Sequence, residues 1–146
     1  MIRQLLLAAV LAVTTTQIST QAFADSPAIG ARKALLKEMG RASGPVGKML
    51  RGDDAFDLAK VQAALDVIAA NSAKLPEFFP EDSQTGDTKA LPAIWQNKAD
   101  VVARFGKLHE DAVAAGPAIT DEASFKAEMP KVLGNCGACH QRYRAK

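Results

Sequence analysis

The chain has 146 residues and a formal net charge of +2 at pH 7; only 5 % of its residues are aromatic, whereas alanine is frequent. This length fits a single domain, and the composition favours helices over sheets because alanine loses no side-chain entropy in a helix. The small charge and the absence of a run of basic residues argue against binding to nucleic acid.

The first residues have the pattern of a secretory signal. Arg3 precedes an apolar stretch over residues 5–13, and AFA at residues 22–24 has the small-x-small pattern of a cleavage site. The apolar stretch is shorter than the roughly 18 residues expected of a membrane-spanning helix. We therefore predict a signal peptide over residues 1–24, cleaved after Ala24, and an exported, periplasmic domain over residues 25–146 without a membrane span.

Two helices are predicted next. Ser26 and Pro27 have the residue types of an N-cap and a first helical turn, and one face then carries residues at i, i+4 and i+7 spacing. This face is formed by Arg32, Leu36, Met39, Ser43, Val46 and Leu50. The pair Gly44-Pro45 predicts a kink or a split in this helix.

Asp57 is predicted to cap a second helix. Its apolar stripe consists of Leu58, Val61, Leu65 and Ile68.

A long irregular stretch, KLPEFFPEDSQTGDTKALP, follows, and we expect it to border a ligand because long ordered loops are often functional. Pro92 is predicted to start a third helix. Thr120 is predicted to cap a fourth, with Asp121 and Glu122 at the positive end of its dipole. Pro130 is expected to distort its first turns. The stripes of these helices are Ile94, Trp95, Val101, Val102, Phe105, Leu108 and Ala112, and Phe125, Met129, Val132, Leu133 and Cys136.

Four amphipathic stripes without any period-2 alternation predict an all-α fold. Each stripe must be buried against its neighbours, and short connections favour antiparallel packing. We therefore predict an antiparallel four-helix bundle over residues 25–146.

Both cysteines of the chain and one of its two histidines stand together near the C-terminus, in the segment CGACH at residues 136–140. Three kinds of chemistry fit parts of this motif. A redox disulfide is permitted by the C-x-x-C spacing and by export, but that motif belongs near a βαβ pattern. A structural zinc ion needs four ligands and the motif supplies three, so His109 would have to be recruited from another helix.

The third chemistry is covalent attachment of haem. C-x-x-C-H is the attachment motif of c-type haem, in which both thiols add to the vinyl groups and the histidine is an axial ligand of the iron. This interpretation accounts for the presence of both cysteines in one motif, for the adjacent histidine and for export. We predict one haem c held covalently by Cys136 and Cys139, with His140 as the proximal ligand, and keep a thiol-redox or metal-binding module as the alternative.

The position of this motif on the last helix of a four-helix bundle resembles the cytochrome c′ family, including its low-spin relatives. The segments ARKALLKEMG and RGDDAFD resemble the first-helix signature of that family and the turn into its second helix. FFPEDS and LPAIW resemble the ends of its long loop, and CGACHQRYR resembles its haem-binding end. The resemblance extends from about Ser26 to the C-terminus, and only the haem motif is specific by itself.

The resemblance implies further contacts with the haem. Arg32 is expected to reach a propionate, and Arg144 to lie near the proximal face. Lys33 and Thr85 are expected at the edge of the haem. In low-spin relatives the position of Leu36 is a methionine that ligates the iron. Leucine has no lone pair to donate, so Leu36 is expected to cover the distal face.

With Leu36 in that place, the resemblance implies a five-coordinate, high-spin iron that binds small gases such as nitric oxide or carbon monoxide and exchanges electrons with redox partner proteins. The alternative is a low-spin electron-transfer cytochrome in which Met39, on roughly the same helix face, is the sixth ligand. No nucleophile or general-base constellation is found, so no enzymatic activity is predicted. The resemblance also suggests a homodimer packed through the first two helices.

Overall fold

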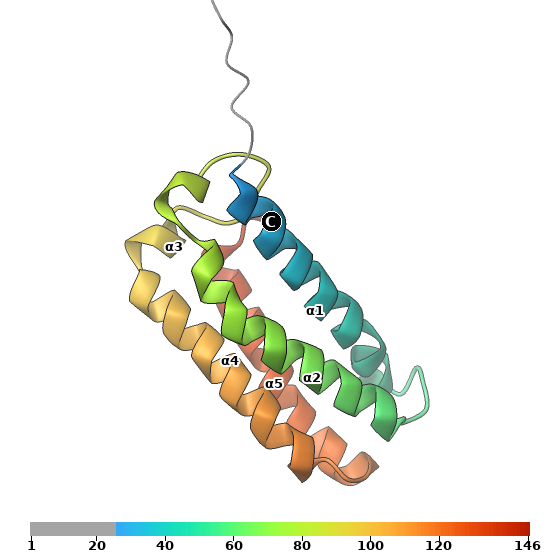
Figure 1. The fold of residues 1–146 in the computed structure, drawn as a ribbon. Coiled ribbons are helices and arrows are strands. Elements are labelled where there is room, and N and C mark those ends of the chain that lie inside the picture. The colour runs from blue at the N-terminus through green and yellow to red at the C-terminus, as the bar shows by residue number, and fades with distance from the viewer. Residues whose placement is uncertain (1–25) are drawn as a thin grey trace, which may run out of the picture.

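The structure is a computed structural model that describes residues 26–146, and the predicted signal peptide and its cleavage site lie outside the described residues. Four long helices run beside one another as an antiparallel bundle (Figure 1): α1 (Pro27–Arg51), α2 (Leu58–Lys74), α4 (Lys98–Ala118) and α5 (Glu122–Tyr143). The connection between α2 and α4 contains the short helix α3 (Ala93–Gln96) and the 3-10 turns η1 (Leu75–Phe78) and η2 (Glu81–Ser83). The predicted all-α, antiparallel four-helix bundle is confirmed.

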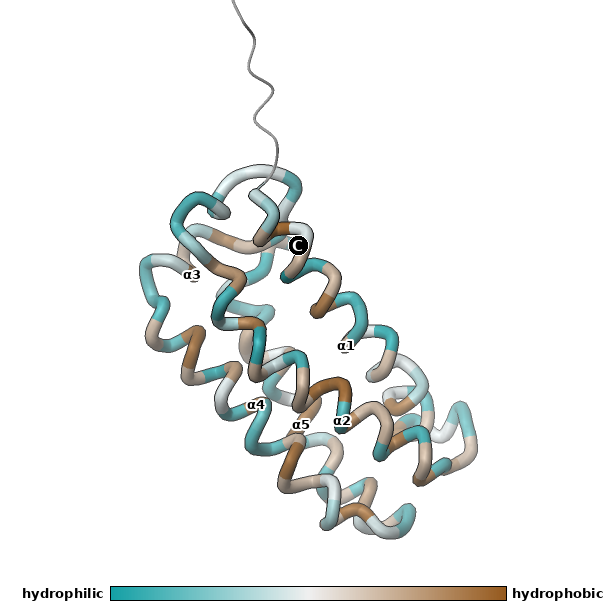
Figure 2. The backbone as a smooth tube through the Cα atoms, in the orientation of Figure 1, coloured by the Kyte–Doolittle hydropathy of each residue, from teal (hydrophilic) through white to brown (hydrophobic). Residues whose placement is uncertain are grey.

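The core is formed by most of the apolar positions that the sequence periodicity predicts, but Leu58 and Val102 of the predicted stripes are exposed, at 36 % and 44 %. Helix α2 packs most extensively against α4, while α1 packs against α2 and α4 against α5. Leu65 and Ile68 of α2 and Phe125 of α5 are at most 2 % exposed. Figure 2 shows hydrophobic and hydrophilic stretches alternating along each long helix, as expected of helices that turn one face toward a shared interior.

Helix α1 continues through Pro45, so of the predicted kink or split the split is wrong, and the kink stays a prediction. Proline lacks the N–H that would bond to the carbonyl of Arg41, but both residues are exposed and that carbonyl can bond to water. The next buried residues along the helix, Val46 and Met49, are 0 % and 5 % exposed, and their burial holds the helix in place across the proline. The helix ends at Gly52, whose φ of 79° is the left-handed cap geometry that glycine adopts without strain.

The predicted third helix is divided in two. Helix α3 begins directly after Pro92, in agreement with the prediction, but the backbone leaves helical geometry at Asn97, where φ is −129° and ψ is 42°. The Asn97 side chain donates a hydrogen bond to the Ala93 carbonyl at 2.9 Å, in competition with the backbone ladder. Helix α4 then starts at Lys98.

The end of α5 pairs with the end of the long connection. The Leu91 N–H donates to the Tyr143 carbonyl at 3.0 Å, and the Ala145 N–H donates to the Lys89 carbonyl at 2.8 Å. An isolated antiparallel bridge lies between these two hydrogen bonds. The pairing brings the motif-bearing end of α5 and the long connection together at the same end of the bundle as the start of α1 (Figure 1).

Helix α5 begins at Glu122, and its N-cap is Asp121 rather than the predicted Thr120. The Ser124 N–H donates to the Asp121 carboxylate at 2.8 Å, and the Asp121 N–H donates to the Ser124 hydroxyl at 3.0 Å. This reciprocal pair satisfies two backbone donors of the first turn. Hydrogen bonds from the Ser124 side chain and backbone hold the pKa of Asp121 below its ordinary value. Pro130 lies inside α5 without interrupting it.

Asp121→Ala should lower the melting temperature by roughly 3 °C, because the first turn of α5 loses its reciprocal cap. The matched change Thr120→Ala should lower it by less than about 1 °C. The native pKa of Asp121 is depressed, so its contribution is present above the unfolded-state pKa and is lost as pH falls through the native value. Thermal unfolding at neutral and acidic pH measures both effects. Equal falls in the melting temperature of the two variants would contradict the assignment of Asp121 as the cap.

Candidate functional site

A cavity of about 630 Å³ lies between α1, α4, α5 and the long connection. Its volume is typical of a site for a small molecule or cofactor. Helices α1 and α5 both line it, and they do not pack extensively against each other, in contrast to the other neighbouring pairs of long helices. The sequence-predicted site residues that line the cavity are Arg32, Lys33, Leu36, Cys136, Cys139, His140 and Arg144.

Thr85, the remaining predicted site residue, is exposed on the loop and does not line the cavity. Thr88 lines it instead, and its hydroxyl accepts a hydrogen bond from Nη2 of Arg32 at 2.8 Å. Beside Arg32, Lys33 forms an ion pair with Asp87 and donates to the Asp87 carbonyl at 3.1 Å. The loop is therefore joined to α1 at two successive residues of the helix.

The guanidinium of Arg32 is enclosed by the loop, and the residue is 1 % exposed. Its Nη1 donates to the Ser83 hydroxyl at 2.8 Å and to the Phe78 carbonyl at 3.3 Å, and its Nη2 donates to the Ser83 carbonyl at 2.8 Å. The guanidinium carbon lies over the rings of Phe79 and Trp95, 5.2 Å and 5.6 Å from their centroids. All these partners are uncharged, and burial lowers the pKa of Arg32.

These contacts give Arg32 a structural role that its sequence position did not predict. Four of the five guanidinium N–H groups bind the loop. The Nε–H is the donor that the loop does not use. That Arg32 reaches a propionate stays a prediction, and this N–H is the group available for it.

Cys136 and Cys139 lie three residues apart on α5, on one face of the helix, and both are half-buried against the cavity. Neither forms a disulfide, and burial raises the pKa of both thiols, which are therefore protonated at neutral pH. Within residues 26–146, no group of three or more His, Cys, Asp and Glu side chains is placed to hold a metal ion. The site thus presents two adjacent thiols to one apolar space.

His140 follows directly on α5 and lines the same cavity. Desolvation, together with the charge of Arg144, lowers the pKa of His140. The neutral imidazole is therefore favoured, and this is the form whose ring nitrogen binds a metal. Arg144 lies one turn further, and its N–H donates to the His140 carbonyl at 3.2 Å.

Two residues of α1 face the cavity from the other side. Leu36 is 39 % exposed, whereas Met39 is 6 % exposed and belongs to the hydrophobic core. Leu36 therefore borders the open part of the cavity, while the Met39 side chain is held by its neighbours. Both line the space in which a bound group would lie, so Met39 stays the alternative to Leu36 as the distal residue.

Sequence reasoning missed three residues beside Cys139. Tyr143 is 2 % exposed and its hydroxyl donates to the Asp100 carboxylate. Nε of Arg104 donates to the same carboxylate at 2.8 Å, and its guanidinium lies over the Tyr143 ring. Hydrogen bonds from Arg104 and Tyr143 hold the pKa of Asp100 below its ordinary value. The i, i+4 spacing of Asp100 and Arg104 on α4 is the sequence signal that predicts this pair.

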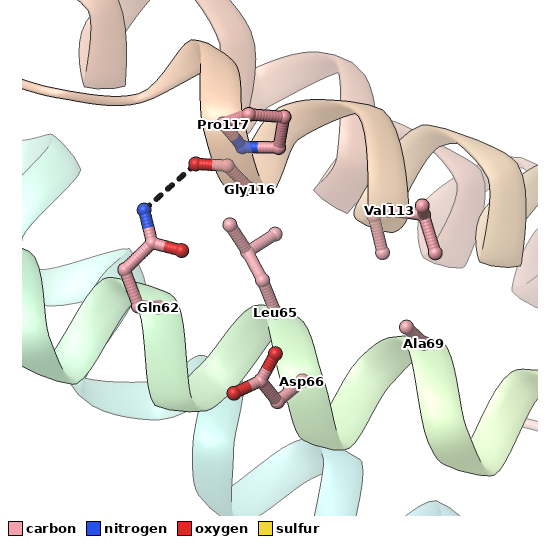
Figure 3. A pocket seen from close by; sticks show the side chains of 8 residues that line it. Gln62, Leu65, Asp66, Ala69, Val113, Gly116 and Pro117 are labelled. Carbon is pink, nitrogen blue, oxygen red and sulfur yellow. Dashed lines mark hydrogen bonds between the residues drawn. The ribbon is translucent and has the colours of Figure 1, made fainter.

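A second cavity, of about 400 Å³, lies between α2 and α4 and contains none of the predicted site residues. Figure 3 shows Gln62 of α2 reaching across to Gly116 of α4, and the Gln62 amide donates to the Gly116 carbonyl at 2.8 Å. Asp66 and Val113 stand at the exposed edge of this cavity. Because its central amide is used to join the two helices, we do not regard this cavity as the functional site.

Comparisons with known proteins match this arrangement over nearly all the described residues. The family model described as cytochrome c′ matches residues 27–144. A cytochrome c′ of Rhodopseudomonas palustris is 52 % identical over 126 residues, with 86 % of each chain covered. A cytochrome c-556 of Agrobacterium fabrum is 38 % identical, with 79 % of each chain covered. A solved structure of cytochrome c′ from Rhodopseudomonas palustris superposes with a TM-score of 0.80 at 51 % identity, covering 84 % of this chain and 98 % of that one.

Arg32→Ala should lower the free energy of unfolding by about 3 kcal/mol, because it leaves the buried Ser83 carbonyl and the half-buried Phe78 carbonyl without their donor. Arg32→Lys should recover only part of this loss, since an ammonium group cannot reproduce the planar fork of the guanidinium. The control Lys33→Ala removes an exposed ion pair and an exposed hydrogen bond to the Asp87 carbonyl, and it should have little effect. Denaturant unfolding measures all three, and small, equal losses at positions 32 and 33 would mean that other contacts hold the loop.

Proposed function

Because the chain belongs to the cytochrome c′ family, we propose that it carries electrons or binds small gases at a haem held in the cavity between α1 and α5. The cofactor of this family is a covalently attached c-type haem. The observation that carries the proposal is the convergence of both cysteines, His140 and Leu36 on one cavity of about 630 Å³.

The lining of the cavity fits a haem. A haem combines a large apolar ring with two carboxylates at one edge, and the cavity combines an apolar wall with cationic side chains. The apolar wall includes the buried residues Ile94, Val101, Phe105 and Leu108. In the proposed site, Cys136 and Cys139 would hold the haem by thioether bonds, their S–H bonds adding across its two vinyl groups, and the Nε–H of Arg32 and the ammonium of Lys33 would bind the propionates.

His140 is the proposed proximal ligand. Its position directly after Cys139 on α5 brings the imidazole to the same part of the cavity as the thiols. The lowered pKa of His140 keeps a ring nitrogen unprotonated at neutral pH. Arg144, one turn further along the chain, is proposed to add positive charge on this proximal side.

Leu36 is the proposed distal residue. It comes from α1, whereas His140 comes from α5, so the two side chains approach the cavity from different helices. An aliphatic side chain excludes water from the space it covers and cannot bind iron. Leu36 borders the open part of the cavity, and Met39 is 6 % exposed within the core, which supports leucine over methionine in this place.

The bound haem supplies one-electron exchange at its iron and, where the sixth position is open, a site for a small gas. The apolar wall keeps water out, and Leu36 restricts access to ligands as small as nitric oxide or carbon monoxide. If Met39 instead moves to the iron, the second candidate function, plain low-spin electron transfer, applies. The site offers no arrangement of nucleophile and base that would support a proposal of enzymatic activity.

The proposed location is the periplasm. Across residues 26–146, none of the helices combines the length and the apolar character needed to cross a membrane, and the signal peptide predicted over residues 1–24 would direct export. Redox partner proteins and, through α1 and α2, a second copy of the chain are the proposed partners; the dimer rests on the family resemblance.

When the protein is expressed together with export and haem-ligation machinery, it should be red and should keep its haem through acid–acetone extraction. Thioether bonds survive this treatment, so the double variant Cys136→Ala, Cys139→Ala should lose its haem. The variant His140→Ala should keep the attached haem but show a changed absorption spectrum. Colourless wild-type protein with a Cys136–Cys139 disulfide would refute the proposal.

Leu36→Ala should accelerate carbon monoxide binding to the ferrous protein several-fold, because it removes the side chain that covers the open part of the cavity. Met39→Leu keeps the volume of the core side chain and should leave the absorption spectrum unchanged. Stopped-flow mixing and absorption spectra of the ferric protein measure the two effects. A sulfur-to-iron band in the wild type that disappears in Met39→Leu would identify Met39 as the sixth ligand and leave electron transfer as the function.

A further inference from the structure

We infer that the mouth of the haem cavity is a docking surface for an acidic protein surface, an inference that rests on the proposed cytochrome function. The cationic residues at this mouth, which we call the basic rim, are Lys33, Lys37, Lys89, Arg104 and Arg144. They come from α1, the long connection, α4 and the end of α5, which are separate in the sequence and meet only around the cavity.

The basic rim concentrates the positive charge of the molecule. Only one carboxylate, Asp87, lies among the residues that line the cavity. The described residues that do not line the cavity include 11 Lys and Arg but 14 Asp and Glu, so the rest of the molecule is acidic on balance. The near-zero charge of the whole chain therefore conceals a strong separation of charge, and this separation orients an approaching charged partner.

Much of the charge of the basic rim is not neutralised within the chain. Lys33 is paired with Asp87, and Arg104 with Asp100. Lys37 and Arg144 are exposed and form no ion pair within residues 26–146, whereas the exposed Lys89 donates a hydrogen bond to the Lys146 main-chain oxygen at 3.4 Å. The lining has six cationic side chains, counting the buried Arg32, and these exceed Asp87, Asp100 and two haem propionates taken together. A positive excess thus remains after the haem is in place.

The form of the surface favours a protein over a lipid bilayer as the partner. Helices that bind at a membrane surface place Trp, Phe or Leu side chains beside their cations so that these insert among the lipids. Here the aromatic residues of the lining, Phe79, Phe105 and Tyr143, are buried, and only Leu36 among the exposed large hydrophobic residues borders the cavity. A concave, cationic mouth is complementary to a protruding acidic surface, and such complementarity mainly raises the rate of encounter.

The first test uses the haem-loaded protein and two small redox probes. Ferrous protein is oxidised by ferricyanide, an anion, and by tris(phenanthroline)cobalt(III), a cation, over a range of ionic strengths. If the basic rim governs approach to the haem, the rate constant with ferricyanide should fall as salt is added, because salt screens the attraction. The rate constant with the cobalt complex should stay level or rise.

Charge reversal locates the effect. Lys37→Glu together with Lys89→Glu should lower the ferricyanide rate constant about tenfold at 0.1 M ionic strength, the lower end of the range for electrostatic steering. The control, Lys48→Glu together with Lys126→Glu, makes the same change in net charge. Lys48 lies 11 residues beyond Lys37 on α1, about 16 Å along the helix, and the Debye length at this ionic strength is about 10 Å. The control should change the rate less than about twofold, and equal effects of the two double variants would overturn the inference.

The second test asks which class of macromolecule binds. Poly-L-glutamate added to isotope-labelled protein should shift the backbone resonances of the residues around the basic rim, and Lys37→Glu with Lys89→Glu should abolish these shifts. Binding to phosphatidylglycerol vesicles without a response to poly-L-glutamate would replace the protein partner with a membrane. These titrations do not depend on haem attachment. A red protein that gives no shifts would contradict the docking surface alone, and a colourless protein that gives the expected shifts would contradict the proposed haem function alone. The two failures are therefore distinguishable.

Discussion

A buried cation, bound by uncharged groups of the described residues, joins the first helix to the long connection, and the walls of the proposed haem site depend on it. The guanidinium of Arg32 gives four of its hydrogen bonds to loop groups and lies against two aromatic rings. The loop that it holds pairs in turn with the end of α5. One side chain on α1 therefore determines where the last turns of α5 meet the rest of the bundle.

This arrangement separates the site into an apolar interior and a charged edge. Helices α2 and α4 form the most extensive contact of the bundle, so they keep the core intact where α1 and α5 diverge. Both cysteines and His140 occupy consecutive turns at the end of α5. With the haem in the proposed place, a partner would approach through the cationic edge, so the same divergence of two helices would determine both the position of the haem and the direction of approach.

The parts of the structure that follow from local pattern were predictable, and those that follow from distant contacts were not. The periodic stripes predicted the four long helices, and the residues of the C-x-x-C-H motif line one cavity, that of about 630 Å³. Thr120 and Asp121 are both good caps, and only Ser124, three residues after Asp121, distinguishes them. No glycine or proline marks the break at Asn97. The hydrogen-bond partners of Arg32 lie 46 to 56 residues away along the chain, beyond the reach of any periodicity.

The divergence of α1 and α5 also has a consequence for the order of events during maturation. A space of about 630 Å³ lined largely by apolar side chains loses the contacts that would stabilise a filled interior. Occupation of this space therefore adds to the stability of the folded chain, because the bound group supplies these contacts. On the proposed function, a chain without its haem is less stable and more open to proteases than the finished cytochrome, and its two half-buried thiols line the space that the haem would fill.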